Sequence, residues 1–283
     1  MIDETVEEIR EMQTHSSSVV AVKAAEALRE LSNREFASIE EYERSLDRNS
    51  RALRRAQPSH ASLHTTQREI VQRVQDAAPE TVEGAKRATE DAIDAVVEEV
   101  KRAKRDAAAN AVELLPDGTV VLTHDYSSTV LEAIEMAAQE GRHLTVYVTE
   151  ARPRFLGRKT ARTLARVDRV ETHLIVDSAA GHFLGECDRV LVGMDCIVDD
   201  TLYNRVGTFP ISATATELAV PVSVVGSSAK LIEDGFAFEN DHRPISEVIL
   251  EPPVGFEVEN PAYDATPTHL LDSVVTDNGI ETV

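Results

Sequence analysis

The chain has 283 residues, of which 42% are hydrophobic, so it is long enough to bury one large core or two smaller ones. Acidic residues outnumber basic residues by 50 to 29, which gives a formal net charge of -21 at pH 7. A negative field of this size repels the phosphates of nucleic acids and argues against direct nucleic-acid binding. No apolar run approaches the ~18 residues that a membrane-spanning helix needs, so no membrane partner is expected.

Arginine supplies most of the positive charge, because only six lysines are present. An acidic chain with few lysines suits a cytoplasm full of salt, where ions screen the repulsion between like charges. The composition therefore favours a halophilic, archaeal source. The acidic first ten residues lack the basic and then apolar order of a signal peptide, so the expected location is cytoplasmic.

Motifs for metals and cofactors are weak. Cys187 and Cys196 give neither a disulfide framework nor the spacing of metal ligands. His60 and His64 have the i, i+4 spacing of a metal-binding helix face, but they lack the Glu of His-Glu-x-x-His and an obvious third ligand. The segment from Gly157 lacks the full spacing of a P-loop, and no Gly-x-Gly-x-x-Gly follows a strand. We expect no metal and no cofactor.

The first third of the chain has the apolar spacing of helices. The predicted helices cover about residues 16–28, 36–53, 63–74 and 79–114. No strand pattern appears before Leu115. The sequence therefore predicts an N-terminal helical domain over residues 1–115.

From Pro116-Asp117-Gly118 onward, strands and helices alternate. The predicted strands are Val120–Thr123, Leu144–Val148, Thr172–Val176, Arg189–Val192 and Val222–Val225, with helices beginning near Ser127, Gly157, Ala179 and Thr208. Continuous apolar strands that alternate with helices predict a parallel sheet covered on both faces. The expected fold class is α/β, with a Rossmann-like parallel sheet over residues 116–283 preceded by the helical domain.

Polar residues gather at the carboxyl ends of these predicted strands, where open α/β sheets bind ligands. The groups are His124-Asp125, Glu150 with Arg152, Asp177-Ser178, Asp195, and Ser227-Ser228 with Lys230. Loops that lead from strand to helix are polar in any case, and Asp177-Ser178 has the position of a helix cap. Neither Arg152 nor Asp195 is needed to start a helix. We predict that one cleft is surrounded by Asp125, Arg152, Asp195, Asn204 and Lys230.

The segment from Val192 to Thr208 carries the most candidate groups. Asn204-Arg205 is expected in a loop, and Gly207-Thr208 then opens a helix. A helix start offers free backbone N–H groups and the positive end of the helix dipole, so it can bind a phosphate that Arg205 also contacts. An ordinary capped helix with a solvated arginine accounts equally well for the pattern.

Several of these segments resemble motifs of the translation initiation factor 2B alpha/beta/delta family, which includes ribose-1,5-bisphosphate isomerase and methylthioribose-1-phosphate isomerase. The resemblance runs from about Val120 to the C-terminus, over the segments Thr123–Ser128, Glu150–Pro153 with Gly157, Gly193–Asp195, Asn204–Thr208 and Asn260–Pro267. It implies a homodimer or larger homo-oligomer, initiation factor 2 as a partner, and a sugar-phosphate or nucleotide ligand. The ligand-binding residues that follow are His124, Ser127, Arg152, Gly157, Asn204, Arg205, Gly207 and Lys230.

The resemblance also implies how an isomerase member works, with a Cys and an Asp on opposite sides of the sugar. The Asp corresponds to Asp195, whereas Asp125 stands where the Cys is expected. An Arg-Gly phosphate-binding loop corresponds to His15–Val19, which has neither residue. If the protein is an enzyme, Asp125 and Asp195 are its catalytic pair, because neighbouring carboxylates raise one pKa of the two.

These observations leave two functional interpretations. The first is a non-catalytic regulatory or binding protein of the initiation factor 2B type that keeps a sugar-phosphate pocket. The alternative is a sugar-phosphate isomerase of the ribose-1,5-bisphosphate isomerase type. The residues at Asp125 and His15–Val19 favour the first. In either case we expect oligomerisation through the C-terminal domain, with Asn260–Pro267 at or near the interface.

The charge predicts that the protein is less stable in dilute salt than in concentrated salt. Lowering the ionic strength lengthens the screening distance from ~3 Å at 1 M to ~30 Å at 0.01 M, so the acidic side chains repel one another more strongly. We expect the melting temperature to fall between molar and millimolar salt. An unchanged melting temperature would contradict both this prediction and the halophilic source.

Overall fold

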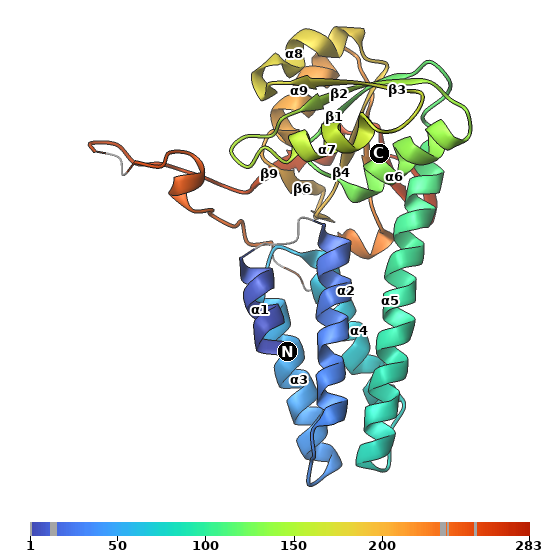
Figure 1. Cartoon of the computed structure of the whole chain (residues 1–283), viewed down its shortest axis with the longest axis vertical. Helices are drawn as coiled ribbons and strands as arrows, with labels where there is room; N and C mark the ends of the chain where they lie inside the picture. The colour runs from blue at the N-terminus through green and yellow to red at the C-terminus, as the bar shows by residue number, and fades with distance from the viewer. Residues whose placement is uncertain (1, 12–15, 233–235, 237, 252–253) are drawn as a thin grey trace. The chain divides into compact units, whose positions relative to one another are not determined.

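The computed structural model describes residues 2–11, 16–232, 236, 238–251 and 254–283 (Figure 1). The chain forms two compact units, residues 1–103 and 104–283. The helix α5 (Val82–Val112) runs across this division, and the first strand begins at Val120. The domain boundary at residue 115 stays a prediction. No helix in the described part of the chain has both the length and the apolar character that a membrane crossing requires.

The first unit consists of helices. They are α1 (Ile2–Arg10), α2 (Ser17–Ala27), the 3-10 helix η1 (Leu28–Asn33), α3 (Ile39–Ala56), α4 (Ala61–Asp76) and most of α5. The start of α3 shows why such segments fold locally, because the Ser38 hydroxyl accepts a hydrogen bond from the Glu41 N–H. Acidic residues in its first turn and Arg54 and Arg55 in its last complement the helix dipole.

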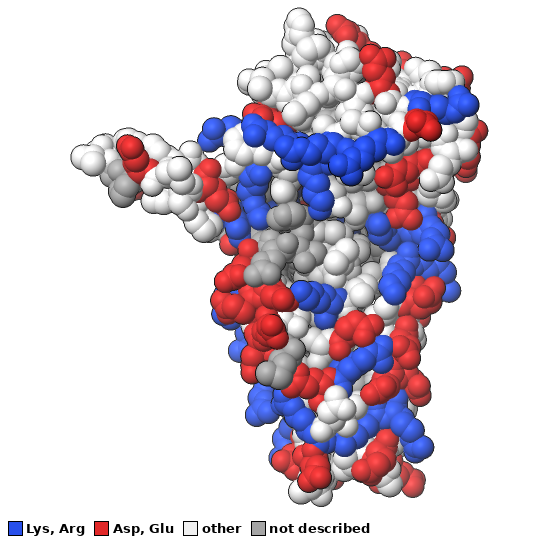
Figure 2. Space-filling view, in the orientation of Figure 1, with Lys and Arg blue, Asp and Glu red and all other residues white. Residues whose placement is uncertain are grey.

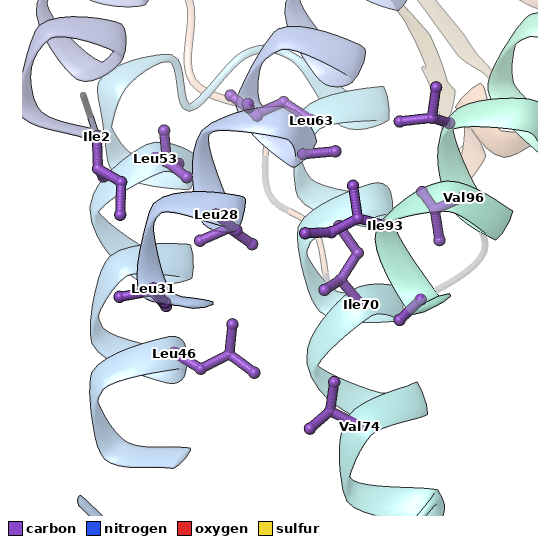
Figure 3. Close-up of a cluster of buried hydrophobic side chains, with 14 of the residues drawn as sticks. Ile2, Leu28, Leu31, Leu46, Leu53, Leu63, Ile70, Val74, Ile93 and Val96 are labelled. Carbon is purple, nitrogen blue, oxygen red and sulfur yellow. The ribbon is translucent and has the colours of Figure 1, made fainter. Parts of the chain in front are cut away.

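A single apolar cluster fills the interior of this unit. Figure 3 shows side chains from several helices that point toward one another, among them Leu28, Leu53, Leu63, Ile70 and Ile93. All five are fully buried. Burial of these side chains supplies the main driving force for folding of the unit, because each one removes apolar surface from water.

The second unit contains a seven-stranded sheet in the order β11-β10-β7-β4-β1-β2-β3. Its strands are β1 (Val120–His124), β2 (Leu144–Thr149), β3 (Val170–Ile175), β4 (Arg189–Gly193), β7 (Val222–Val225), β10 (Ser273–Thr276) and β11 (Gly279–Thr282). All neighbours are parallel except β10 and β11. The predicted α/β class, with helices followed by a mostly parallel sheet, is confirmed. The strand order reverses between β1 and β4, which leaves a crevice at their carboxyl ends.

Helices cover both faces of this sheet (Figure 1). They are α6 (Ser128–Gln139), α7 (Gly157–Leu164), α8 (Ala180–Phe183) and α9 (Thr208–Glu217), with the short 3-10 turns η2 (Asp177–Ala179) and η3 (Leu184–Glu186) beside α8. Alternate side chains of β1 enter different cores, since Val121 packs with residues of α6 and α7 and Leu122 packs with residues of α8 and α9. Both strand faces are therefore apolar, as the continuous apolar runs predicted.

A second sheet of four strands, in the order β8-β5-β6-β9, was not predicted from the sequence. It consists of β5 (Cys196–Val198), β6 (Thr201–Arg205), β8 (Leu231–Ile232) and β9 (Tyr263–Pro267). Asn204 and Arg205 therefore end a strand, where a loop was expected. Asp199 and Asp200 both have positive φ and make the tight turn between β5 and β6, a position that asparagine or glycine more often fills.

The segment Asn260–Pro267, expected near an oligomer interface, is largely an internal element. Tyr263 and Thr266 are buried within the chain, and β9 pairs with β6. Exposed apolar side chains lie earlier, at Ile245, Val248, Ile249, Leu250, Val254 and Phe256. Homo-oligomerisation itself stays a prediction.

Gly157 marks a close approach between α7 and the end of β2. A Cβ at this position would overlap the backbone carbonyl oxygen of Thr149, which cannot move without distorting the sheet. We expect Gly157→Ala to destabilise the protein by about 2 kcal/mol or more in urea unfolding at molar salt. The control Gly185→Ala places its Cβ in open space and should change the stability by less than about 0.5 kcal/mol. Equal effects of the two substitutions would show that this approach does not constrain the fold.

Candidate functional site

A pocket opens at the carboxyl edge of the large sheet, within the second unit. The space between its walls is about 370 Å³, including space that is open to solvent. Its charged lining residues are Asp125, Arg152, Arg154, Arg205, Arg243 and Glu247. Although the whole chain carries a net charge of -21, this lining is rich in guanidinium groups. Lys and Arg side chains also form a band across one face of this unit (Figure 2). The pocket therefore suits an anionic ligand.

Asp125 directly follows β1 and has a positive φ of 59°. Its side chain is buried, with Oδ2 3.5 Å from Nε of Arg205, while Oδ1 has no hydrogen-bond partner among the residues that the structure describes. Burial raises the pKa of the Asp125 carboxyl and Asp195 adds to this, whereas Arg205 and His124 oppose it. A carboxyl that holds its proton more tightly than usual can act as a general acid.

Arg205 ends β6 and lies over the Tyr263 ring, 4.8 Å from its centroid. Burial by itself lowers the pKa of its guanidinium, but Tyr263, Asp195 and Asp125 outweigh this effect and the pKa is raised. Arg205 thus stays charged next to Asp125. The pocket places a carboxyl that can hold a proton beside a fixed positive charge.

Two arginines of this pocket, Arg154 and Arg243, were missed from the sequence. Nη2 of Arg243 donates to Oε1 of Glu247 at 2.9 Å, and Nε of Arg154 lies 3.7 Å from the same oxygen. Asn260 donates to the other carboxylate oxygen of Glu247 at 3.3 Å. Arg154 directly follows the segment Glu150–Pro153 and could have been suspected from it. Arg243 lies where no element was predicted, so nothing in its surroundings marked it.

Three of the predicted ligand-binding residues make hydrogen bonds within the chain, and their role in ligand binding stays a prediction. His124 uses both ring nitrogens, since Nε2 lies 2.7 Å from the Val206 carbonyl oxygen and Nδ1 lies 2.6 Å from the Thr149 hydroxyl. A carbonyl oxygen can only accept, so Nε2 donates to Val206, while the Thr149 hydroxyl can either donate to Nδ1 or accept from it. Ser127 caps α6 by accepting from the Val130 N–H, and Asn204 donates to the Thr208 hydroxyl.

At the helix start at Gly207 the sequence left a phosphate site and an ordinary capped helix equally open, and the structure shows a helix capped by a side chain of the chain itself. The N–H groups of Gly207 and Phe209 both donate to Oδ2 of Asp264, at 2.7 and 3.0 Å. Pairing of β9 with β6 sets Asp264 opposite Asn204. This pairing brings the carboxylate of Asp264 to the start of α9. A carboxylate of the chain itself thus satisfies the helix dipole. Gly207 keeps a backbone role, because it has φ of 110° and packs against His124.

The predicted cleft is only partly as expected. Asp125 and Arg152 line the pocket, whereas Asp195, Asn204 and Lys230 are buried beside it and do not. Nζ of Lys230 donates to the Met194 carbonyl oxygen at 2.6 Å, and burial lowers its pKa although Asp195 opposes this. Asp195 still acts on the pocket, because its charge raises the pKa of Asp125. Gly157 serves the close packing against Thr149 described above.

Three further features of the sequence remain, namely the Cys196 thiol, the stretch that contains His15, and metal-ligating side chains. Burial, with a contribution from Asp195, raises the pKa of the Cys196 thiol to about 12, so this thiol does not form a nucleophilic thiolate at neutral pH. His15, in the stretch compared with the Arg-Gly loop, lies outside the described residues. Over the described ranges, no three His, Cys, Asp or Glu side chains are placed to hold a metal ion.

Comparison with known proteins gives a consistent result over nearly the whole chain. The family model described as the initiation factor 2 subunit family matches residues 13–282. A ribose 1,5-bisphosphate isomerase of Haloterrigena turkmenica is 32% identical and the alignment covers 97% of this chain and 88% of that protein. One of Haloferax volcanii is 31% identical over 97% of this chain and 87% of that protein. The structure of a Pyrococcus horikoshii OT3 translation initiation factor eIF-2B superposes with a TM-score of 0.86 at 25% identity, covering 99% and 96% of the two chains.

These relatives correct the first functional interpretation. A non-catalytic regulatory protein was favoured because of Asp125 and His15–Val19, yet proteins named ribose 1,5-bisphosphate isomerase match this chain almost end to end. That interpretation is wrong, and the isomerase alternative is better supported. Asp125, which differs from the family's pattern, is buried in the folded chain, as is Asp195.

Asp125 should make the folded protein less stable as the pH rises. A carboxyl whose folded pKa is raised contributes its full stability below its ordinary pKa, and this contribution is lost as the pH rises through the folded value. Asn at this position has no proton to lose and tolerates positive φ. We expect the stability of Asp125→Asn relative to the wild type to rise as the pH increases above ~3.9, the ordinary pKa of an aspartate, and to level off once the pH has passed the raised folded pKa.

The measurement is the melting temperature of both proteins against pH in molar salt. Asp168→Asn, at an exposed position, is the control and should leave the difference from the wild type independent of pH. A constant difference between Asp125→Asn and the wild type would contradict the raised pKa.

Proposed function

The chain belongs to the initiation factor 2 subunit family, and we propose that it is an aldose–ketose isomerase that acts on a phosphorylated pentose, of the ribose-1,5-bisphosphate isomerase type. The names of the relatives support the reaction class. One observation of this chain carries the proposal, namely the buried Asp125 carboxyl with a raised pKa at the wall of an arginine-lined pocket. Perturbed carboxyls of this kind are typical of catalytic sites.

The arginines of the pocket fit a phosphorylated substrate. A guanidinium binds phosphate through paired, charge-assisted hydrogen bonds and stays charged at any physiological pH. Arg152, Arg154, Arg205 and Arg243 line the pocket together. The phosphate of the sugar would bind to this group of arginines, which positions the carbon atoms next to Asp125.

Conversion of a cyclic aldose 1-phosphate into a ketose requires two proton transfers. Breaking the bond between C1 and the ring oxygen adds a proton to that oxygen, and forming the C2 ketone removes the proton of the C2 hydroxyl as hydrogen moves from C2 to C1. Asp125, which holds its proton tightly, suits the donor role. Asp195 follows β4 and does not itself line the pocket, but it is close enough to raise the pKa of Asp125, and as the counterpart of the family's Asp it is assigned the role of acceptor.

Asp125 replaces the thiol that the family resemblance implies at this position. A neutral carboxyl can donate a proton as a thiol can, provided that its surroundings keep it protonated near neutral pH. Burial of Asp125 and the nearby Asp195 both favour the protonated form of this carboxyl. Arg205 would also stabilise the Asp125 carboxylate after the proton has left.

The test is an NMR assay for ketose bisphosphate formed from ribose-1,5-bisphosphate in molar salt. We expect turnover of about 1–10³ s⁻¹ for the wild type. Asp125→Asn and Asp195→Asn should each lower it by about 10²–10⁴-fold, because each removes one partner of the proton transfers. The exposed control Asp168→Asn should keep the wild-type rate. Absence of turnover in the wild type, or full activity of both variants, would refute the proposed reaction.

A further inference from the structure

Glu247 places a negative charge inside a pocket that otherwise attracts anions. Its carboxylate accepts from Arg243 at 2.9 Å and from Asn260 at 3.3 Å, and it lies 3.7 Å from Nε of Arg154. All four residues line the pocket. The carboxylate therefore lies where two guanidinium groups would hold an anionic ligand.

Nη1 of Arg243 also lies 3.6 Å from Oδ2 of Asp241, but four arginines line the pocket against two carboxyl side chains, so Glu247 does not fully balance the positive charge. Burial lowers the pKa of the Arg154 guanidinium, and the neighbouring Arg243 and Arg205 lower it further, against the opposing effects of Glu247 and Asp125. Nε of Arg243 is also buried without a hydrogen-bond partner among the described residues. The arginines can thus accept more negative charge than Glu247 supplies.

We propose that Glu247 is an internal competitor for the phosphate of the ligand and sets the selectivity of the pocket for phosphate dianions. Carboxylate and phosphate bind guanidinium groups in the same way, but a phosphate dianion carries more charge and one more oxygen. A dianion therefore displaces Glu247 from Arg154 and Arg243, whereas a singly charged carboxylate ligand gains little over the side chain already there. Glu247 is a specificity-determining residue and takes no part in the proton transfers.

The placement of Glu247 in the chain allows such a displacement. It ends the short 3-10 helix η5 (Ile245–Glu247), and residues on either side of it are exposed, with Leu250 89% exposed. The segment is held to the pocket mainly through side chains of the pocket itself. Asn260 donates to the Pro244 carbonyl oxygen at 3.0 Å, and Arg152 donates to that of Val248 at 3.3 Å. Segments with so few buried apolar side chains open at low cost in free energy.

This inference rests on the proposed binding of phosphate in the pocket, but it does not depend on isomerisation. It is therefore tested by binding alone. Calorimetric titration of the full chain with inorganic phosphate, at fixed potassium chloride concentration, compares the wild type with Glu247→Gln. We expect about tenfold tighter phosphate binding by the variant, which corresponds to about 1.4 kcal/mol. Titration with acetate should show the preference for phosphate over the monoanion falling in the same variant.

Two further variants separate the local effect from a general one. Glu251→Gln removes the same charge from an exposed position on the same segment and should bind phosphate as the wild type does. Arg154→Gln should bind phosphate about tenfold or more weakly, because it removes a guanidinium that holds the anion. Equal or weaker phosphate binding by Glu247→Gln would overturn the proposal, since Glu247 would then support the arginines. The proposal also fails if the wild type does not bind phosphate.

A measurement on the wild type gives an independent check that needs no variant. Amide hydrogen exchange in residues 245–251 should become faster when phosphate is added, because displacement of Glu247 frees this segment. Slower or unchanged exchange in these residues would contradict the displacement. Faster exchange and tighter phosphate binding by Glu247→Gln, without any isomerisation, would support the competitor role and refute the proposed reaction alone.

Discussion

Burial of charged side chains at the carboxyl edge of the large sheet is the constraint on which the second unit depends. Asp125 and Arg205 lose most of their contact with water, and their ion pair at 3.5 Å offsets only part of that loss, since the pKa of Asp125 remains raised. The stabilisation that compensates comes from two apolar clusters, one on each face of the sheet. Because the strands are apolar on both faces, their packing can hold the Asp125 carboxyl in a buried position that costs free energy.

The basic residues that line the pocket are all arginines. A guanidinium keeps its charge when it is largely buried and is less strongly hydrated than an ammonium group, so Arg205 can remain cationic beside Asp125. Lys230 shows the contrast, because burial lowers its pKa and its ammonium group is directed at the Met194 carbonyl oxygen. Because the chain has a net charge of -21, the site can attract an anion only if its positive side chains lie close together and stay charged. Arginine provides both.

The large sheet and the edge that bears the site were predictable because the relevant signals are local. Each parallel strand is a continuous apolar run, and the rule that ligands bind at carboxyl ends then pointed to Asp125 and Arg152. The second sheet was not predictable, since its β5–β6 turn uses Asp199 and Asp200 at positive φ and its strands are short. Arg243 lies outside every segment singled out in the sequence. Asp264 lies within Asn260–Pro267, but its contact with the start of α9 depends on partners that only the folded chain brings together.

The contact between Asp264 and the start of α9 also determines how late in synthesis the second unit can finish folding. The helix follows β6, but the carboxylate that satisfies its N–H groups comes from β9, 57 residues beyond Gly207. Strand β10, which pairs with β7 and with β11, is synthesised later still. A chain that emerges from the ribosome can form its helical unit early, since domains fold as units from the N-terminus. The residues that surround the pocket reach their final arrangement only when synthesis is nearly finished.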